Sequence, residues 1–490
     1  MYLVKKAFSR SPFVVYLLTP LQGDFLFCKG YLYKNMNHSA HLAPLFAPAF
    51  VLEAVRLVEG TGISDQLFDI WVEEGIITGL YPTQSRPIAA NFARPLPAPA
   101  TRENEICLSA AWLDMRAWVG EMGYEYKETL IQTEAAALRG GFLQVAILPN
   151  QQPILENKET VAFFKNKKKI ENGAVEWLPI AALTAQCQGK DLTEFHDLQA
   201  AGAVAFSDGL KAVHHTGTLL RALQYAKPLG AVLMQISKEP YLSERGQMHE
   251  GIASTRLGLR GLPALAEAMA IEQMLALLRY TGGRLHFSTL STAEGVALIR
   301  KAKAEGLAVS ADMAAYQLSF LDEDLAEFDT HLKVYPPFRG NTDRLALLSA
   351  LQDGTIDCVV SNHQPQDLES KRLEFDLAEF GITSLQTAFS SLYAALLPHL
   401  GREKSLALAV EKLTAAPRAI LGLEKKVVKV GEKAFFTLFA PEAAHDFENN
   451  PLAKNASKAT NSPFLDAKIA AQKLKGRVLG VVENEKCYLF

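Results

Sequence analysis

The residues that decide which chemistry this chain can perform follow an apolar, strand-like run that ends at Asp114. In a strand, positions i and i+2 point the same way, so two histidines at 116 and 118 could hold one metal ion. The chain has Arg116 and Trp118 there instead. A guanidinium keeps its proton and an indole only donates a hydrogen bond, so neither can coordinate zinc.

The elements that must position these residues alternate in type along the chain. Apolar, strand-like runs alternate with helical periodicity, which is typical of a parallel sheet wrapped by helices and, at this length, of an α/β (β/α)₈ TIM barrel. Strands are expected at 145–148, 203–206, 231–234, 284–287, 308–310 and 358–360, and helices at 216–226, 263–279, 293–304 and 343–351. Active sites of such barrels lie where the strands end.

Four segments are predicted from the chain order. Residues 1–46 form an N-terminal extension, explained either by a mis-called start (with Met36 as the initiator) or by disorder. Residues 47–100 read as hairpin strands and form the first part of a small β-sandwich. Residues 101–420 form the barrel, and residues 421–490 return to complete the sandwich.

Composition sets the broad class. The chain has 490 residues, 49% of them apolar and 21% charged, with a net charge of -3. These values are typical of a soluble globular protein and give no electrostatic reason to expect nucleic acid or a membrane as partner. The five cysteines form no C-x-x-C pair, which favours free thiols in a reducing compartment, so a cytoplasmic location is expected.

Three neighbouring segments carry a resemblance to a known family. They are 121–129 (EMGYEYKET), 133–142 (TEAAALRGGF) and 148–153 (LPNQQP). They resemble the start of the barrel in dihydroorotases of the cyclic amidohydrolase superfamily, which runs D-x-H-x-H-L-R-E-P-G, A-A-x-x-G-G-F-T and M-P-N-T-x-P. The resemblance covers nearly everything after residue 46. It implies the metallo-dependent hydrolase fold and a zinc-dependent interconversion of dihydroorotate and carbamoyl aspartate.

The resemblance implies six metal-ligand positions, and five of them hold residues that cannot bind zinc. They are Arg116, Trp118, Ile236, Thr289 and Asn362. Neighbouring motifs, such as Ser291-Thr292 after Thr289, fix the register at each. The acidic candidate that survives is Asp208, although a gap-free alignment can place Gly209 there instead. We therefore expect no cofactor, although the family uses zinc.

Most of the family's catalytic and substrate-binding residues are also replaced in this sequence. Asn362 stands at the position of the family's catalytic aspartate, and an amide cannot take a proton at neutral pH. The arginine that clamps the substrate carboxylate in the family falls at Gly120. Asn150 and Arg116 remain as candidate substrate-binding residues. His286 is expected to be a hydrogen-bonded core histidine.

Three functions follow from this pattern. The favoured one is a catalytically inactive homologue that acts as a structural or regulatory partner of aspartate transcarbamoylase, with a homodimer implied by the resemblance. The second is an active or altered cyclic amidohydrolase whose remodelled site uses Arg116, His286, His363 and Asp208. The third is a non-catalytic sensor in which the vacated pocket binds a pyrimidine intermediate.

Overall fold

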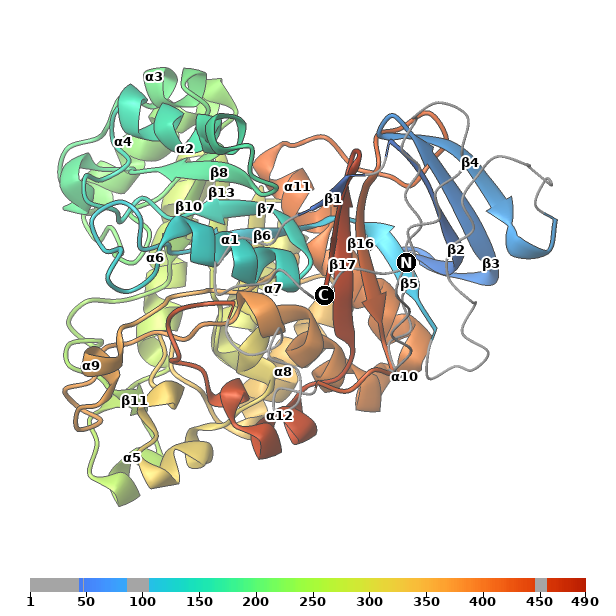
Figure 1. Ribbon diagram of the computed structural model, residues 1–490. Helices are drawn as coiled ribbons and strands as arrows, with labels where there is room; N and C mark the ends of the chain where they lie inside the picture. Colours follow the sequence, from blue (N-terminus) through green and yellow to red (C-terminus); the bar gives the residue numbers. More distant parts are fainter. Residues whose placement is uncertain (1–43, 47, 86–104, 446–455) are drawn as a thin grey trace.

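A computed structural model describes residues 44–46, 48–85, 105–445 and 456–490. The predicted extension 1–46 therefore lies almost entirely outside the described residues. Figure 1 shows two neighbouring bodies, a barrel of strands and helices and a sheet that contains strands from both chain ends.

The barrel is built from eight parallel strands in the order β15-β14-β13-β10-β9-β8-β7-β6. Their bounds are β6 Trp112–Ala117, β7 Phe142–Ile147, β8 Glu176–Ala181, β9 Ala205–Phe206, β10 Val232–Ile236, β13 Arg284–Ser288, β14 Val309–Ala314 and β15 Cys358–Val360. A parallel bridge between Ala117 and His363 brings the last strand end back to the first. The sheet is thus nearly closed.

Helices follow the strands around the barrel. They are α1 Leu130–Arg139, α2 Lys158–Glu171, α3 Phe195–Ala200, α4 Thr216–Ala226, α6 Leu265–Thr281, α7 Ala293–Ala304, α8 Asn341–Gln352, α10 Ala388–Leu413 and α11 Ala415–Leu421. Short elements in the loops are β11 Met248–His249, α5 Ile252–Leu257, β12 Gly261–Leu262 and α9 Leu368–Lys371. Local sequence sets the helix ends: the Thr292 side chain accepts a hydrogen bond from the backbone N–H of Gly295 and caps α7.

The second body is an eight-stranded sheet in the order β1-β18-β17-β16-β5-β2-β3-β4. Its strands are β1 Leu45–Phe46, β2 Ala49–Glu59, β3 Gly62–Glu73, β4 Ile76–Pro82, β5 Cys107–Ala110, β16 Phe435–Ala440, β17 Arg477–Glu483 and β18 Lys486–Leu489, and helix α12 Ala467–Lys473 precedes β17. This confirms the predicted barrel with a small β domain from both chain ends. The predicted segment boundaries at 47–100, 101–420 and 421–490 stay predictions.

One aromatic residue ties the two bodies together. The Trp112 ring of β6 lies 4.7 Å from Phe389 of α10 and 5.5 Å from Phe439 of β16, between ring centroids. Trp112 is fully buried. Aromatic groups bury large apolar areas, so this cluster fixes the first barrel strand against the small sheet.

One barrel strand was not expected from the sequence. Strand β8 contains Pro179, which has no backbone N–H to give to a neighbouring strand. The Pro179 carbonyl still accepts a hydrogen bond from the Val204 N–H at 2.9 Å, and Pro179 lies opposite Ile147 in the sheet. Pro179 is tolerated in β8 because its carbonyl makes the hydrogen bond on the side that faces Val204 and β9.

Two further properties bear on the setting of the protein. Within the described part of the chain, no helix is both long enough and apolar enough to cross a membrane. Four cysteines, Cys107, Cys187, Cys358 and Cys487, are buried free thiols.

Candidate functional site

A cavity of about 300 Å³ opens at the barrel mouth, where the strands end. Its lining includes Arg116, Ile236 and Asn362, which are three of the five expected metal-ligand positions that hold residues unable to bind zinc. Sequence reasoning did not single out two basic residues that also line it, Lys238 and Arg245. Lys238 lies two residues after Ile236, so the period of the strand could have identified it.

Arg116 lines this cavity and is only 3% exposed. Its Nε donates to Asn362 Oδ1 at 3.0 Å, and its Nη2 donates to the Gly209 carbonyl at 3.1 Å. Both acceptors are neutral oxygens. Burial lowers the pKa of the Arg116 guanidinium below its usual value, and the nearby Asp312 opposes this shift.

Hydrogen-bond donors and acceptors around the Asn362 side chain hold its amide in one orientation. Its Oδ1 accepts from Arg116, and its Nδ2 donates to the Tyr316 hydroxyl at 2.7 Å and to the Tyr335 carbonyl at 3.2 Å. Burial raises the pKa of Tyr316 far above its usual value, so this hydroxyl stays protonated. The group at the catalytic position is therefore an amide that already uses both of its polar atoms.

The two other expected ligand positions, Trp118 and Thr289, are not among the residues that line the cavity. Trp118 directly follows β6, and its Nε1 donates to the Asn150 carbonyl at 2.8 Å. Thr289 has a left-handed backbone (φ 56°), and its hydroxyl donates to the Ser288 carbonyl.

Asn150 and Asp208 lie in two different loops, after β7 and after β9, that contact each other. Both carboxylate oxygens of Asp208 accept hydrogen bonds from Thr184, one from its backbone N–H at 2.8 Å and one from its hydroxyl. The Asn150 side chain donates to the Asp208 carbonyl and accepts from the Leu210 N–H. These contacts hold the loop around Asp208 against its neighbours, and the Gly209 carbonyl of the same loop accepts a hydrogen bond from Arg116.

Two buried carboxylates, Asp312 and Asp114, already have hydrogen-bond partners within the protein. Asp312 of β14 contacts His286 Nε2 at 2.8 Å and accepts from the Thr289 N–H at 2.6 Å. His286 is completely buried and its Nδ1 contacts the Ser310 hydroxyl, as expected of a core histidine. Asp114 accepts from the N–H and hydroxyl of Ser361, and burial raises its pKa to about 7.

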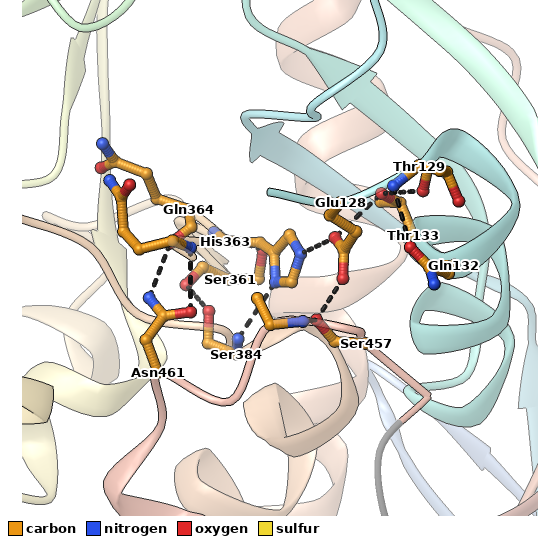
Figure 2. Close-up of polar contacts among 12 residues, drawn as sticks. Glu128, Thr129, Gln132, Thr133, Ser361, His363, Gln364, Ser384, Ser457 and Asn461 are labelled. Atoms are coloured by element: carbon orange, nitrogen blue, oxygen red, sulfur yellow. Dashed lines mark hydrogen bonds and ion pairs between the residues drawn. The ribbon is translucent and has the colours of Figure 1, made fainter. Parts of the chain in front are cut away.

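His363, next to Asn362, belongs to a separate buried network (Figure 2). Its Nε2 contacts Glu128 Oε2 at 2.8 Å, and its Nδ1 accepts from the Ser384 N–H at 3.1 Å. Glu128 also accepts from the hydroxyls of Thr133 and Ser457. The network ties the loop that carries Asn362 to α1 and to the C-terminal segment around Ser457. Glu128 was not identified from the sequence, because its partners are far away along the chain.

The residues gathered at the mouth do not fit the binuclear zinc of the family. Among the residues that the structure describes, no group of three or more His, Cys, Asp or Glu side chains is placed to hold a metal ion. A permanently charged guanidinium, an isoleucine and an amide at three of the ligand positions supply neither the lone pairs nor the negative charge that zinc needs.

Comparison with solved structures defines the class by fold. The structure superposes on L-hydantoinase (dihydropyrimidinase) from Arthrobacter aurescens with a TM-score of 0.69 at 20% identity, covering 89% of this chain and 94% of the other. It superposes on dihydropyrimidinase from Brevibacillus agri with a TM-score of 0.72 at 16% identity, covering 90% and 95%. The fold is therefore that of the cyclic amidohydrolases.

Sequence comparison narrows the class to one family. The model described as "Dihydro-orotase-like" matches residues 108–295. Dihydroorotase from Pelotomaculum thermopropionicum is 40% identical over 72% of this chain and 81% of its own length. Dihydroorotase from Geotalea daltonii is 34% identical over 84% and 94%. The chain belongs to the dihydroorotase family.

Family membership corrects one expectation. From the lost metal ligands, the sequence predicted that the chain uses no cofactor. This prediction is wrong, because the relatives are dihydroorotases and the structural neighbours are hydantoinases, a class that uses zinc. No cofactor is confirmed for this chain.

Proposed function

We propose that this dihydroorotase homologue has lost hydrolytic activity and acts as a structural or regulatory partner of aspartate transcarbamoylase in pyrimidine biosynthesis. The observation that carries the proposal is the hydrogen bond between Arg116 and Asn362, which both line the mouth cavity. A cation and a neutral amide stand where the family has a metal ligand and its general base.

The loss of activity follows from the acid–base chemistry of these groups. Hydrolysis of a cyclic amide needs an activated water and a group that takes its proton. Arg116 cannot accept a proton, and the Asn362 amide is neither basic nor free. The nearby carboxylate of Asp312 is already bound by His286 and Thr289.

The partner role is supported by the family resemblance and by the surface. Large apolar side chains are exposed near the loops after β10 and at the start of α6, including Tyr241, Ile252, Leu265 and Met269. Large exposed apolar side chains of this kind favour association with a partner surface. We propose that such surfaces serve a homodimer and the transcarbamoylase, in the reducing cytoplasm where the buried thiols stay free.

Co-elution tests the partner proposal. The purified chain and the aspartate transcarbamoylase of the same organism should elute together at a larger size than either alone in size-exclusion chromatography. Ile252→Glu should weaken the complex, whereas Glu369→Gln, an exposed change elsewhere in the chain, should not. Separate elution of the wild-type proteins at micromolar concentration would exclude a stable complex.

A further inference from the structure

A two-stranded ribbon lies in the long segment between β10 and α6. Its strands β11 and β12 run parallel, with His249 opposite Leu262. Met248 is completely buried in an apolar cluster that also contains Tyr316 and Phe320. Figure 1 shows β11 and α5 beside each other at the lower left of the barrel. The ribbon is therefore packed against the barrel.

One arginine bonds both strands of this ribbon. Arg339 is 3% exposed, and its Nη1 donates to the Leu262 carbonyl at 2.8 Å and to His249 Nδ1 at 3.1 Å. Its Nε donates to the Ser291 hydroxyl at 3.1 Å. The hydroxyl of Ser291 in turn donates to the buried carboxylate of Glu267. The Arg339 guanidinium therefore links β11 and β12 to the loop that follows β13.

The contact with Arg339 fixes the protonation state of His249. A guanidinium only donates hydrogen bonds, so Nδ1 must accept, and the ring must be neutral with its proton on Nε2. A proton on Nδ1 would set two N–H donors against each other and place two positive charges 3.1 Å apart. Burial and then the charge of Arg339 accordingly lower the pKa of His249 below its usual value.

The other charges around His249 only weaken this conflict. Asp322, which starts a short 3-10 helix, Asp343 of α8 and the adjacent Glu250 favour the protonated ring, but the pKa of His249 stays lowered. Helix α5 carries one charge, Arg256, which is exposed. Strand β12 carries none. The folded ribbon therefore disfavours the protonated ring.

We propose that the hydrogen bond between Arg339 and His249 is a pH-sensitive latch, and that protonation of His249 releases the segment 243–262 from the barrel. This segment carries Ile252, an exposed part of the association surface proposed above. It also contributes Ser243 and Gln247 to the lining of the barrel mouth. The inference goes beyond the proposed function, because the latch depends neither on the transcarbamoylase nor on the loss of hydrolysis.

The direction of the pH dependence follows from proton linkage. The pKa of His249 in the folded ribbon lies below the usual value of 6.5, so the released segment binds the proton more tightly. The latch is therefore complete above about pH 7.5 and weakens as the pH falls. Below about pH 6.5, the equilibrium constant for release should rise by up to about tenfold per pH unit, because one proton is taken up.

Hydrogen exchange of the full chain, read by mass spectrometry between pH 5.5 and pH 7.5, tests the latch. Each exchange rate is divided by the intrinsic rate at the same pH, so that the ratio reports local opening. Protection of 243–262 should fall by up to about tenfold per pH unit below pH 6.5, while helix α7 at 293–304 keeps its protection. Equal protection of 243–262 at both ends of the range overturns the proposal. A parallel loss in both segments shows general loosening and also overturns it.

Two variants test the assignment to His249. His249→Asn keeps an oxygen that can accept from Arg339 but does not titrate, so protection of 243–262 should become independent of pH. His196→Asn removes an exposed histidine beside Asp197 and should keep the wild-type response. A wild-type pH response in His249→Asn overturns the assignment. Circular dichroism checks folding, and the two wild-type segments decide the question by themselves if His249→Asn does not fold.

Discussion

Replacing His363 separates a structural role from a catalytic one. His363 is 1% exposed and contacts Glu128, which is completely buried, at 2.8 Å. His363→Ala would leave this carboxylate without one of its donors, and a buried polar group that loses its partner costs about 1–3 kcal/mol. The Ser384 N–H would also lose its acceptor, at a similar cost. Because the two losses share one side chain and do not simply add, we expect a decrease of about 2–4 kcal/mol in the free energy of unfolding.

The chain contains a matched control for this change. His331 contacts Asp329 at 2.7 Å, a similar geometry, but both side chains are more than one third exposed. His331→Ala should therefore cost less than about 1 kcal/mol. Chemical denaturation followed by tryptophan fluorescence measures both variants, since Trp112 and Trp177 are buried in the barrel.

A second substitution tests the physical cause. Glu128→Gln removes the buried charge, so the double variant His363→Ala/Glu128→Gln should be more stable than His363→Ala alone by about 1–3 kcal/mol. The reasoning is refuted if His363→Ala is no more destabilising than His331→Ala.

Two further predictions concern buried carboxylates. Burial raises the pKa of Asp114 to about 7, so the folded state holds its proton more tightly than the unfolded chain does. The stabilisation from this proton is complete below about pH 4 and is lost as the pH rises to about 7. Asp114→Asn should therefore gain stability relative to the wild type over this range, by up to about 4 kcal/mol, in urea titrations at several pH values; parallel pH profiles would contradict this. Glu267 accepts hydrogen bonds from the N–H and hydroxyl groups of both Ser291 and Thr292, so Glu267→Gln, which turns one acceptor into a donor, should cost about 2–4 kcal/mol in the same assay, and a neutral effect would contradict the contacts.

Long, strongly periodic elements could be predicted from the sequence. The expected helices at 216–226 and 293–304 have the same bounds as α4 and α7, because each has an apolar stripe and a residue that caps its start. Strand β8 was missed because Pro179 argues against a central strand unless the pairing of its neighbours is known. The fold class could thus be predicted from local sequence patterns, whereas strand β8 could be recognised only from its pairing with neighbouring strands.

The candidate site could be predicted only in part. Strand position and family motifs identified Arg116, Ile236 and Asn362, which line the cavity. The same alternation failed for Trp118, which follows the end of β6, donates to the Asn150 carbonyl and does not line the cavity. The partners of Asn362, such as Tyr316, come from distant loops, and the sequence does not specify which loops meet.

A turnover assay tests the central claim most directly. The purified full chain is incubated with dihydroorotate, and separately with carbamoyl aspartate, at pH 6 to 9 with zinc supplied. The guanidinium–amide pair of Arg116 and Asn362 predicts no rate above the uncatalysed reaction in either direction. Turnover by the wild-type chain that disappears in Arg116→Met would show that this pair forms a working active site and would contradict the account.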